Sequence, residues 1–305
     1  MPQPCDLIFK SAGLDSLRRD FNQDAKNSTL HKKREGWATQ GPSFEFGGGW
    51  ENGYDVSALI TYPIEENPMA NLNTEKITLN VADGTSMNAY VAAPADGAKV
   101  PGLLVFQEAF GVNAHIRDVA DRFAKEGYVA IAPELFHRTG PGFEGDYGNF
   151  PACMPHMQAL TPEGMIADAR AAFDWLQKNP RVLPNATACT GYCMGGRASF
   201  LANSALPLKA AVSYYGGGIV PGLLPRVATQ NAPILFFWGA LDTHIPKEHV
   251  RAIVDAMQEA NKTYVNVEFS DANHAFFCDA RPAYKETAAR QAWKLTLEFL
   301  ATYVR

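Results

Sequence analysis

A thiol at the tip of a predicted sharp turn is the residue in this chain best placed to do chemistry. Cys193 lies within residues 190–197, TGYCMGGR, whose G-x-C-x-G-G pattern is that of a nucleophile elbow between a strand and a helix. Glycine is needed at 191 and 195 because a β-carbon there would collide with the neighbouring backbone. The following helix would point its N-terminal amides at negative charge on the sulfur. The pattern therefore predicts a cysteine nucleophile.

A thiol nucleophile needs a base to take its proton and a carboxylate to orient that base. Asp242 follows the predicted strand 234–238, and His274 follows the predicted strand 265–269. Both lie beyond strand ends, at the edge of the sheet where Cys193 points, and they follow it in the order nucleophile, acid, histidine. We therefore expect a Cys193-His274-Asp242 triad.

Other residues compete for two of these roles. Asp271 and Asp279 lie in the same loop as His274 and are alternative acids, whereas His244 is the nearest rival base. His244 shares a short loop with Asp242, so we expect it at the surface or in an orienting role. Each residue alone fits an ordinary structural role, but the elbow and the chain order together favour catalysis.

An oxyanion hole requires two backbone N–H groups beside the nucleophile. Met194 follows the nucleophile and supplies one, and Ala109 in the turn at 107–113, QEAFGVN, supplies the other. The neighbouring Glu108 reads on its own as an acid at a helix start, where it is favourable to the helix dipole.

The elements that position these residues alternate between strands and helices. The runs 77–81 and 87–92 alternate apolar and polar residues around Asp83-Gly84, which predicts a hairpin. Later apolar runs are continuous, as in strands covered on both faces, and helical spacings separate them. This order predicts an α/β fold with a mainly parallel sheet flanked by helices on both faces. The predicted buried strands are 102–106, 129–132, 186–189, 210–214, 234–238 and 265–269.

Residues 1–72 differ from the rest of the chain in amino-acid composition. They are rich in charged and amide residues, include the basic run at 31–34, and hold no long periodicity. We expect an N-terminal extension that packs across the catalytic domain, residues 73–305, or across a neighbouring subunit in a homo-oligomer. A basic membrane-binding arm is the less favoured interpretation of this segment, because the basic run at 31–34 is short and has no large apolar residues interleaved with it.

Composition excludes several classes of function. The net charge of −5 argues against a nucleic-acid partner, and no apolar run is long enough to cross a membrane. The first thirty residues are too charged for a signal peptide, and the five cysteines are irregularly spaced, so we expect a cytoplasmic protein. Neither an H-E-x-x-H motif nor paired C-x-x-C motifs occur, so we expect no metal and no cofactor.

Four motifs in this order resemble the dienelactone hydrolase family, over about residues 75–305. They are QEAFGVN at 107–113, GYCMGG at 191–196, YYG at 214–216 and NHAF at 273–276. The resemblance implies an α/β-hydrolase fold and a lactonase or esterase, carboxymethylenebutenolidase-like, that acts through a Cys193-His274-Asp242 triad and an acyl-thioester. It also implies that Glu108 hydrogen-bonds the resting thiol and takes its proton when substrate arrives.

The same motifs suggest the residues that contact substrate. Family members that act on dienelactone hold its carboxylate with two arginines, but the position four residues after His274 is Cys278, and residues 151–160 contain no arginine. Arg138 and Arg281 substitute for these arginines only if their loops turn them inward. A less charged ester or lactone is as consistent with the sequence as an anionic dienelactone. A catalytically silent ligand-binding module is the alternative function. The full set of candidate substrate-binding residues is Phe110, Tyr192, Tyr214, Tyr215, Phe276, Arg138 and Arg281.

Overall fold

The computed structural model describes residues 71–304. The predicted N-terminal extension therefore lies almost wholly outside the described residues, and its packing stays a prediction. The first described strand begins at Leu72, next to the boundary that the sequence places between residues 72 and 73.

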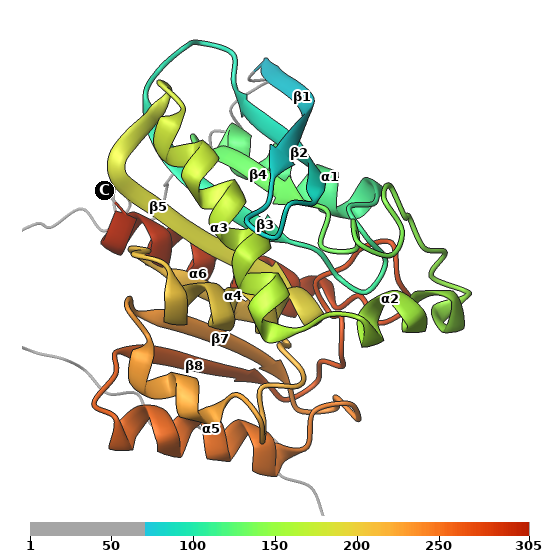
Figure 1. Ribbon diagram of the computed structural model, residues 1–305. Coiled ribbons are helices and arrows are strands. Elements are labelled where there is room, and N and C mark those ends of the chain that lie inside the picture. The colour runs from blue at the N-terminus through green and yellow to red at the C-terminus, as the bar shows by residue number, and fades with distance from the viewer. Residues whose placement is uncertain (1–70, 305) are drawn as a thin grey trace, which may run out of the picture. The chain divides into compact units, whose positions relative to one another are not determined.

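One eight-stranded sheet, in the order β1-β2-β4-β3-β5-β6-β7-β8, runs through the described chain (Figure 1). The predicted hairpin is β1 with β2, which also pairs antiparallel with β4, and the remaining neighbours are parallel. The prediction of a mainly parallel α/β sheet is confirmed. The strands are β1 Leu72–Asn80, β2 Ser86–Pro94, β3 Val100–Phe106, β4 Val129–Pro133, β5 Val182–Tyr192, β6 Ala211–Tyr214, β7 Ile234–Gly239 and β8 Tyr264–Phe269.

Helices cover both faces of this sheet. Figure 1 shows α3 (Pro162–Lys178) and α4 (Met194–Ala205) in front of β5, with α6 (Glu286–Val304) behind it. Helix α1 (Ala114–Lys125) shares the rear face with α6, since the rings of Phe123 and Trp293 lie 4.5 Å apart. Helix α5 (Lys247–Glu259) connects β7 to β8.

Local sequence explains where the helices begin. The side chain of Thr161 accepts a hydrogen bond from the Gly164 N–H and Pro162 opens α3, as the Thr-Pro pair predicts. Asn113 caps α1 in the same way through the Ile116 N–H. The segment between β4 and α3 holds two short helical pieces, the 3₁₀ turn η2 (Phe150–Cys153) and α2 (Met154–Gln158). A second 3₁₀ segment, η3 (Leu224–Thr229), precedes β7.

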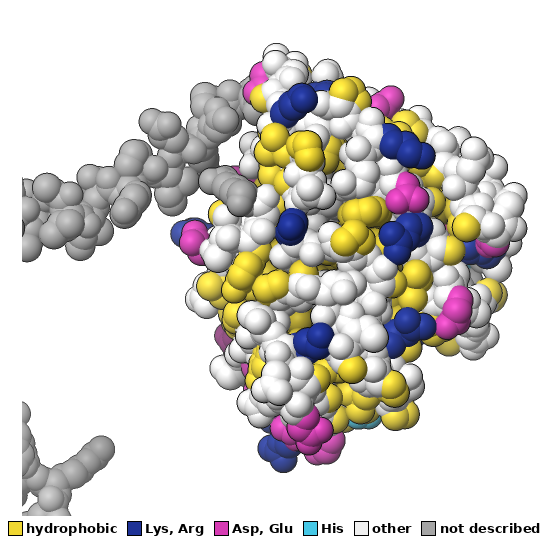
Figure 2. Space-filling view, turned by 60° about the vertical axis from the view of Figure 1, so that its left-hand side comes forward, with side chains coloured by type: hydrophobic (Ala, Val, Ile, Leu, Met, Phe, Trp, Pro, Cys, Tyr) yellow, Lys and Arg dark blue, Asp and Glu magenta, His cyan; other side chains and the backbone are white. Residues whose placement is uncertain are grey.

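Strand register brings the functional segments to one edge. Phe106 pairs with Gly191, Tyr192 pairs with Tyr214, and Gly239 pairs with Phe269. The carboxyl ends of these parallel strands therefore meet at one edge, where α/β proteins build their sites. No helix among residues 71–304 combines the length and hydropathy that crossing a membrane requires. On the face in Figure 2, basic and acidic side chains are interspersed, and no single basic patch forms there.

Candidate active site

The turn after β5 holds Cys193 in an uncommon backbone conformation. Its φ is 58° and its ψ is −120°, a region that a residue with a side chain seldom adopts. A β-carbon on Gly191 would collide with the Gly195 carbonyl, and one on Gly195 would collide with the Phe106 carbonyl. The glycines thus permit the close crossing of β3, β5 and α4 that presents the half-buried Cys193 at the helix N-terminus.

His274 and Asp242 form a buried pair beside this thiol. The Nδ1 of His274 lies 2.7 Å from Asp242 Oδ2, and the two side chains are 12% and 2% exposed. The other oxygen of Asp242 accepts the backbone N–H groups of His244 at 2.7 Å and Ile245 at 3.2 Å. These bonds fix the carboxylate, which in turn orients the imidazole so that Nδ1–H faces Asp242 and Nε2 is left for another partner.

That other partner is the thiol. Burial by itself lowers the pKa of His274, but negative charge at Cys193 and hydrogen bonds with Asp242 and Cys193 outweigh it and raise the pKa to about 10. Burial raises the pKa of Asp242, and the stronger combined effect of His274 and the His244 amide lowers it. The electrostatics therefore favour the imidazolium form of His274 beside Asp242.

Cys193 and His274 open into one cavity of about 360 Å³. A cavity of this size accommodates a small ester or lactone. Its wall is partly aromatic and partly cationic. The lining residues are Ala109, Phe110, Tyr147, Phe150, Met157, Cys193, Met194, Arg197, Gly217, Gly218, His244, His274 and Arg281.

Glu108 lies behind this wall in the turn after β3. It is 1% exposed, and neither carboxylate oxygen has a hydrogen-bond partner among the described residues. The hydrogen bond from the resting thiol to Glu108 that the family resemblance implies is therefore not formed in this structure. The nearest cation is Arg281, whose Nη1 lies 3.8 Å from Glu108 Oε1. Arg281 also lies over the rings of Phe110 and Tyr147, so it connects the buried carboxylate to the cavity.

Some of the predicted oxyanion-hole and substrate-binding residues line the cavity and others do not. Ala109, Met194, Phe110 and Arg281 line the cavity with Cys193 and His274. Four predicted substrate contacts do not line it, because they are fully buried in an aromatic cluster behind the triad: Tyr192, Tyr214, Tyr215 and Phe276. The ring of Tyr215 lies 5.0 Å from that of His274, so this cluster supports the imidazole from behind.

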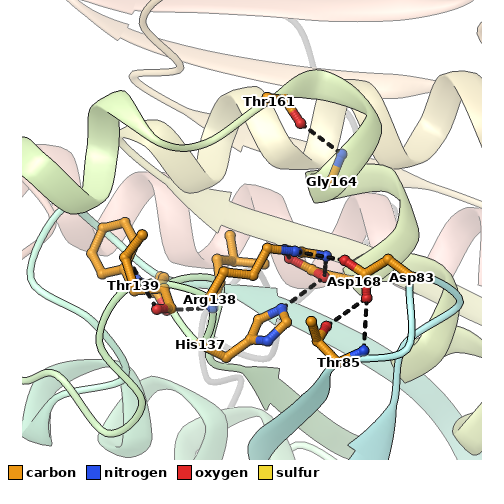
Figure 3. Close-up of polar contacts among 11 residues, drawn as sticks. Asp83, Thr85, His137, Arg138, Thr139, Thr161, Gly164 and Asp168 are labelled. Atoms are coloured by element: carbon orange, nitrogen blue, oxygen red, sulfur yellow. Dashed lines mark hydrogen bonds and ion pairs between the residues drawn. The ribbon is translucent and has the colours of Figure 1, made fainter.

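Arg138 belongs to a separate ion network (Figure 3). Its guanidinium makes two hydrogen bonds to the fully buried Asp168, at 2.9 and 2.8 Å, and a third to Asp83 at 2.7 Å. His137 Nε2 contacts the same Asp168 at 3.0 Å. The network joins the β1–β2 turn to α3 and leaves Arg138 outside the cavity lining, which corrects the expectation that its loop turns it inward.

The rival acids and base have other surroundings. Asp271 pairs with Lys285 at 2.9 Å, and Asp279 pairs with Arg122 at 2.6 Å. His244 is exposed at the cavity rim, with its ring 5.2 Å from that of His274 in an edge-to-face contact. Of the two histidines, His274 is the one whose ring nitrogen contacts Asp242.

Sequence reasoning missed several lining residues. Arg197 stands in the elbow motif itself, four residues after Cys193, which places it one helical turn along α4 on the same side. That spacing was a signal available in the sequence. Tyr147, Phe150 and Met157 come from irregular or short helical chain between β4 and α3, where no periodicity marks them.

Comparisons with known proteins agree with this geometry. The model of the dienelactone hydrolase family matches residues 87–304. A Salmonella typhimurium protein named "Putative carboxymethylenebutenolidase" is 39% identical over 74% of this chain and 87% of its own length. A Synechocystis protein of the same name is 35% identical over 71% of this chain and 92% of its own. A crystal structure of a "Putative Dienelactone Hydrolase" from Klebsiella pneumoniae superposes with a TM-score of 0.70 at 31% identity, covering 76% of this chain and all of that one.

Proposed function

This chain belongs to the dienelactone hydrolase family, and from that premise we propose that it hydrolyses a carboxylic ester or lactone with Cys193 as the nucleophile. The observation that carries the proposal is the 2.7 Å contact between His274 and Asp242 beside a thiol that opens into the same cavity. Carboxymethylenebutenolidase is the name of the curated relatives, and it suggests a lactone as the first substrate to examine.

Acylation begins when Cys193 Sγ attacks the carbonyl carbon of the substrate. The carbonyl oxygen becomes an oxyanion, which the backbone N–H groups of Ala109 and Met194 stabilise. His274 gives its proton to the leaving alkoxide oxygen as the C–O bond breaks, and a thioester on Cys193 remains. In a lactone this step opens the ring and leaves the alcohol attached to the acyl chain.

Deacylation uses the same imidazole in the opposite direction. Neutral His274 takes a proton from water, and the resulting hydroxide attacks the thioester carbonyl. The tetrahedral intermediate collapses by breaking the C–S bond, which releases the carboxylic acid and restores the thiolate beside imidazolium. Asp242 holds the imidazole in the required tautomer throughout.

Glu108 regulates the resting thiol in this proposal. An anionic carboxylate near sulfur disfavours the thiolate, and cationic His274 favours it. In this proposal Cys193 gives its proton to Glu108 when substrate enters, which frees the nucleophile. Neither Glu108 oxygen is hydrogen-bonded to a described residue in the structure, so the two side chains must approach one another for this transfer.

The cavity favours a substrate with an apolar part. Phe110, Tyr147 and Phe150 form one aromatic wall. Arg281 lies over two of these rings, and Arg197 supplies a second cation to the lining. We therefore propose small aryl or unsaturated esters and lactones, with uncharged and anionic forms to be compared.

Replacing Cys193 by Ala tests the proposal directly. We expect turnover of an aryl ester and of a small lactone to fall to the uncatalysed rate, and electrospray mass spectrometry of the wild type during turnover to reveal an acyl adduct on residue 193. Cys189→Ala is the matched control, because its thiol is buried in β5 and 0% exposed. Undiminished turnover in Cys193→Ala would show that Cys193 is not the nucleophile. Ligand binding without turnover in the wild type would favour the catalytically silent binding module.

A further inference from the structure

A second cluster of ligand-type side chains lies behind the cavity wall. Glu108, His115 and Cys278 come from the turn after β3, the start of α1 and the loop after His274, and all three are buried. One carboxylate oxygen, one imidazole nitrogen and the sulfur all lie within 4.8 Å of one another. We propose that these three residues bind a zinc ion, which holds Glu108 and inhibits the enzyme.

The geometry is close to that of a three-ligand zinc site. Three atoms within 4.8 Å of one another fit inside a circle of radius 4.8 Å divided by the square root of three, about 2.8 Å. Zinc bonds to oxygen, nitrogen and sulfur are about 2.0–2.3 Å long. Each ligand therefore moves inward by less than about 1 Å to coordinate an ion at the centre, which small rotations of the three side chains provide.

Polar atoms without hydrogen bonds support a ligand at this position. Both carboxylate oxygens of Glu108 and both ring nitrogens of His115 lack hydrogen-bond partners among the described residues. Their ionic contacts are longer, 3.8 Å from Glu108 to Arg281 and 3.5 Å from His115 to Asp279. Burying polar groups without hydrogen bonds costs free energy, which a bound cation offsets.

Each proposed ligand also has an outer partner of the kind that metal sites use. His115 Nδ1 lies 3.5 Å from Asp279 Oδ1, an orientation that leaves Nε2 for the ion. Cys278 Sγ lies 3.4 Å from the Tyr147 hydroxyl, which accepts a hydrogen bond from the Asn113 amide and can donate its own proton to a thiolate.

Charge is balanced when zinc is bound. The ion carries two positive charges, and Glu108 and the Cys278 thiolate carry one negative charge each. Arg281, 3.8 Å from Glu108, and Arg122, paired with Asp279, are the other charges that face the cluster. Zinc binds cysteine as the thiolate, so the ion must displace the proton of the Cys278 thiol as it binds.

Zinc binding and catalysis compete for Glu108. A carboxylate that coordinates zinc is not free to take the proton of Cys193, so the inhibition rests on the proposed function. Metal binding itself does not, because the Cys193→Ala protein retains all three ligands. The two ideas can therefore fail separately.

The binding experiment uses full-length Cys193→Ala protein, which removes the competing thiol of the triad, titrated with Co²⁺ and then with Zn²⁺. We expect one equivalent of Co²⁺ to produce a thiolate-to-cobalt charge-transfer absorption, which Zn²⁺ then abolishes by displacement. Adding Cys278→Ser should remove the absorption, and His115→Gln should weaken binding at least about 100-fold. Asp279→Asn should weaken it about 10–100-fold.

Asp271→Asn is the matched control for the outer partner, since Asp271 is exposed in the same loop and pairs with Lys285. Cys153→Ser is the control for the thiol, because Cys153 is buried but is not one of the three ligands. Circular dichroism and urea unfolding identify folded variants, and Glu108→Gln replaces any ligand variant that does not fold. Absence of the charge-transfer absorption, or its persistence without Cys278, would overturn the site. In the wild type, zinc inhibition that His115→Gln leaves unchanged would overturn the inhibitory role.

Discussion

Asp242 holds His274 with one carboxylate oxygen and the following loop with the other. Oδ2 lies 2.7 Å from His274 Nδ1, while Oδ1 accepts the backbone N–H groups of His244 and Ile245. The carboxylate that contacts the imidazole is therefore itself held by two backbone N–H groups, which fix the alignment of the pair.

Asp242→Asn should separate orientation from folding. The amide keeps the shape of the side chain but removes its charge and favours the wrong imidazole tautomer, so we expect kcat to fall about 10⁴-fold. Steady-state kinetics with an aryl ester measure the loss. Asp271→Asn is the control and should retain wild-type kcat. A loss of less than tenfold in Asp242→Asn would mean that another acid serves His274.

Arg197→Gln should reveal how the cavity selects charge. Burial lowers the pKa of the Arg197 guanidinium, and no carboxylate of residues 71–304 forms an ion pair with it. An anionic substrate group would supply the missing countercharge. We expect KM to rise about tenfold for esters that carry a carboxylate, the value of one modest charge-assisted hydrogen bond, and to change little for neutral esters.

The control for that comparison is Arg251→Gln, on the exposed surface of α5. Equal changes of KM for the charged and neutral esters in Arg197→Gln would show that Arg197 does not discriminate between charged and neutral substrates.

Asp168→Asn should destabilise the fold. Asp168 is fully buried, and the substitution leaves Arg138 and His137 facing an uncharged amide. Breaking a buried ion pair in this way costs about 3–5 kcal/mol, which urea unfolding measures. Arg138 is 27% exposed and lies outside the cavity lining, so Arg138→Gln should lower stability by less and leave KM unchanged. An increase in KM in Arg138→Gln would indicate that this arginine contacts the substrate after all.

Alkaline pH should weaken the fold through buried thiols. Burial raises the pKa of Cys189 from 9.0 to about 12, so the folded state keeps a proton that the unfolded chain releases above pH 9.0. The contribution of Cys189 to the free energy of unfolding is therefore full below pH 9.0 and is lost as the pH rises toward 12, by at most about 1.4 kcal/mol per pH unit.

Urea unfolding of the wild type and of Cys189→Ala between pH 8 and about 10.5 tests this sign. The difference in stability between the two proteins should decrease above pH 9.0. A difference that grows with pH would contradict a protonated Cys189 in the folded state.

The regular elements, and the contact between His274 and Asp242 beyond the strand ends, could be predicted from local sequence, because each depends on short-range patterns. The G-x-C-x-G-G motif, the apolar strands and the capping Thr161 are all visible within a few residues. The positions of Arg138 and of the four buried aromatic residues could not be predicted from local sequence, because they depend on which distant side chains pack around them. Asp168 lies 30 residues from Arg138 in sequence, and nothing near either one marks the pair.

For the same reason, the sequence did not predict the cluster of Glu108, His115 and Cys278. A metal site can be recognised in a sequence when two of its ligands lie in the same helix or turn. Here the third ligand comes from a loop near the end of the chain, and tertiary packing alone brings it to the other two.

The order of the sheet has a consequence for synthesis. His274 follows β8, which is synthesised after every other strand of the described sheet. A nascent chain that stops before β8 therefore carries Cys193 and Asp242 without the imidazole that contacts both in the folded protein. Under the proposed function, such a chain does not yet hold the base that Cys193 requires.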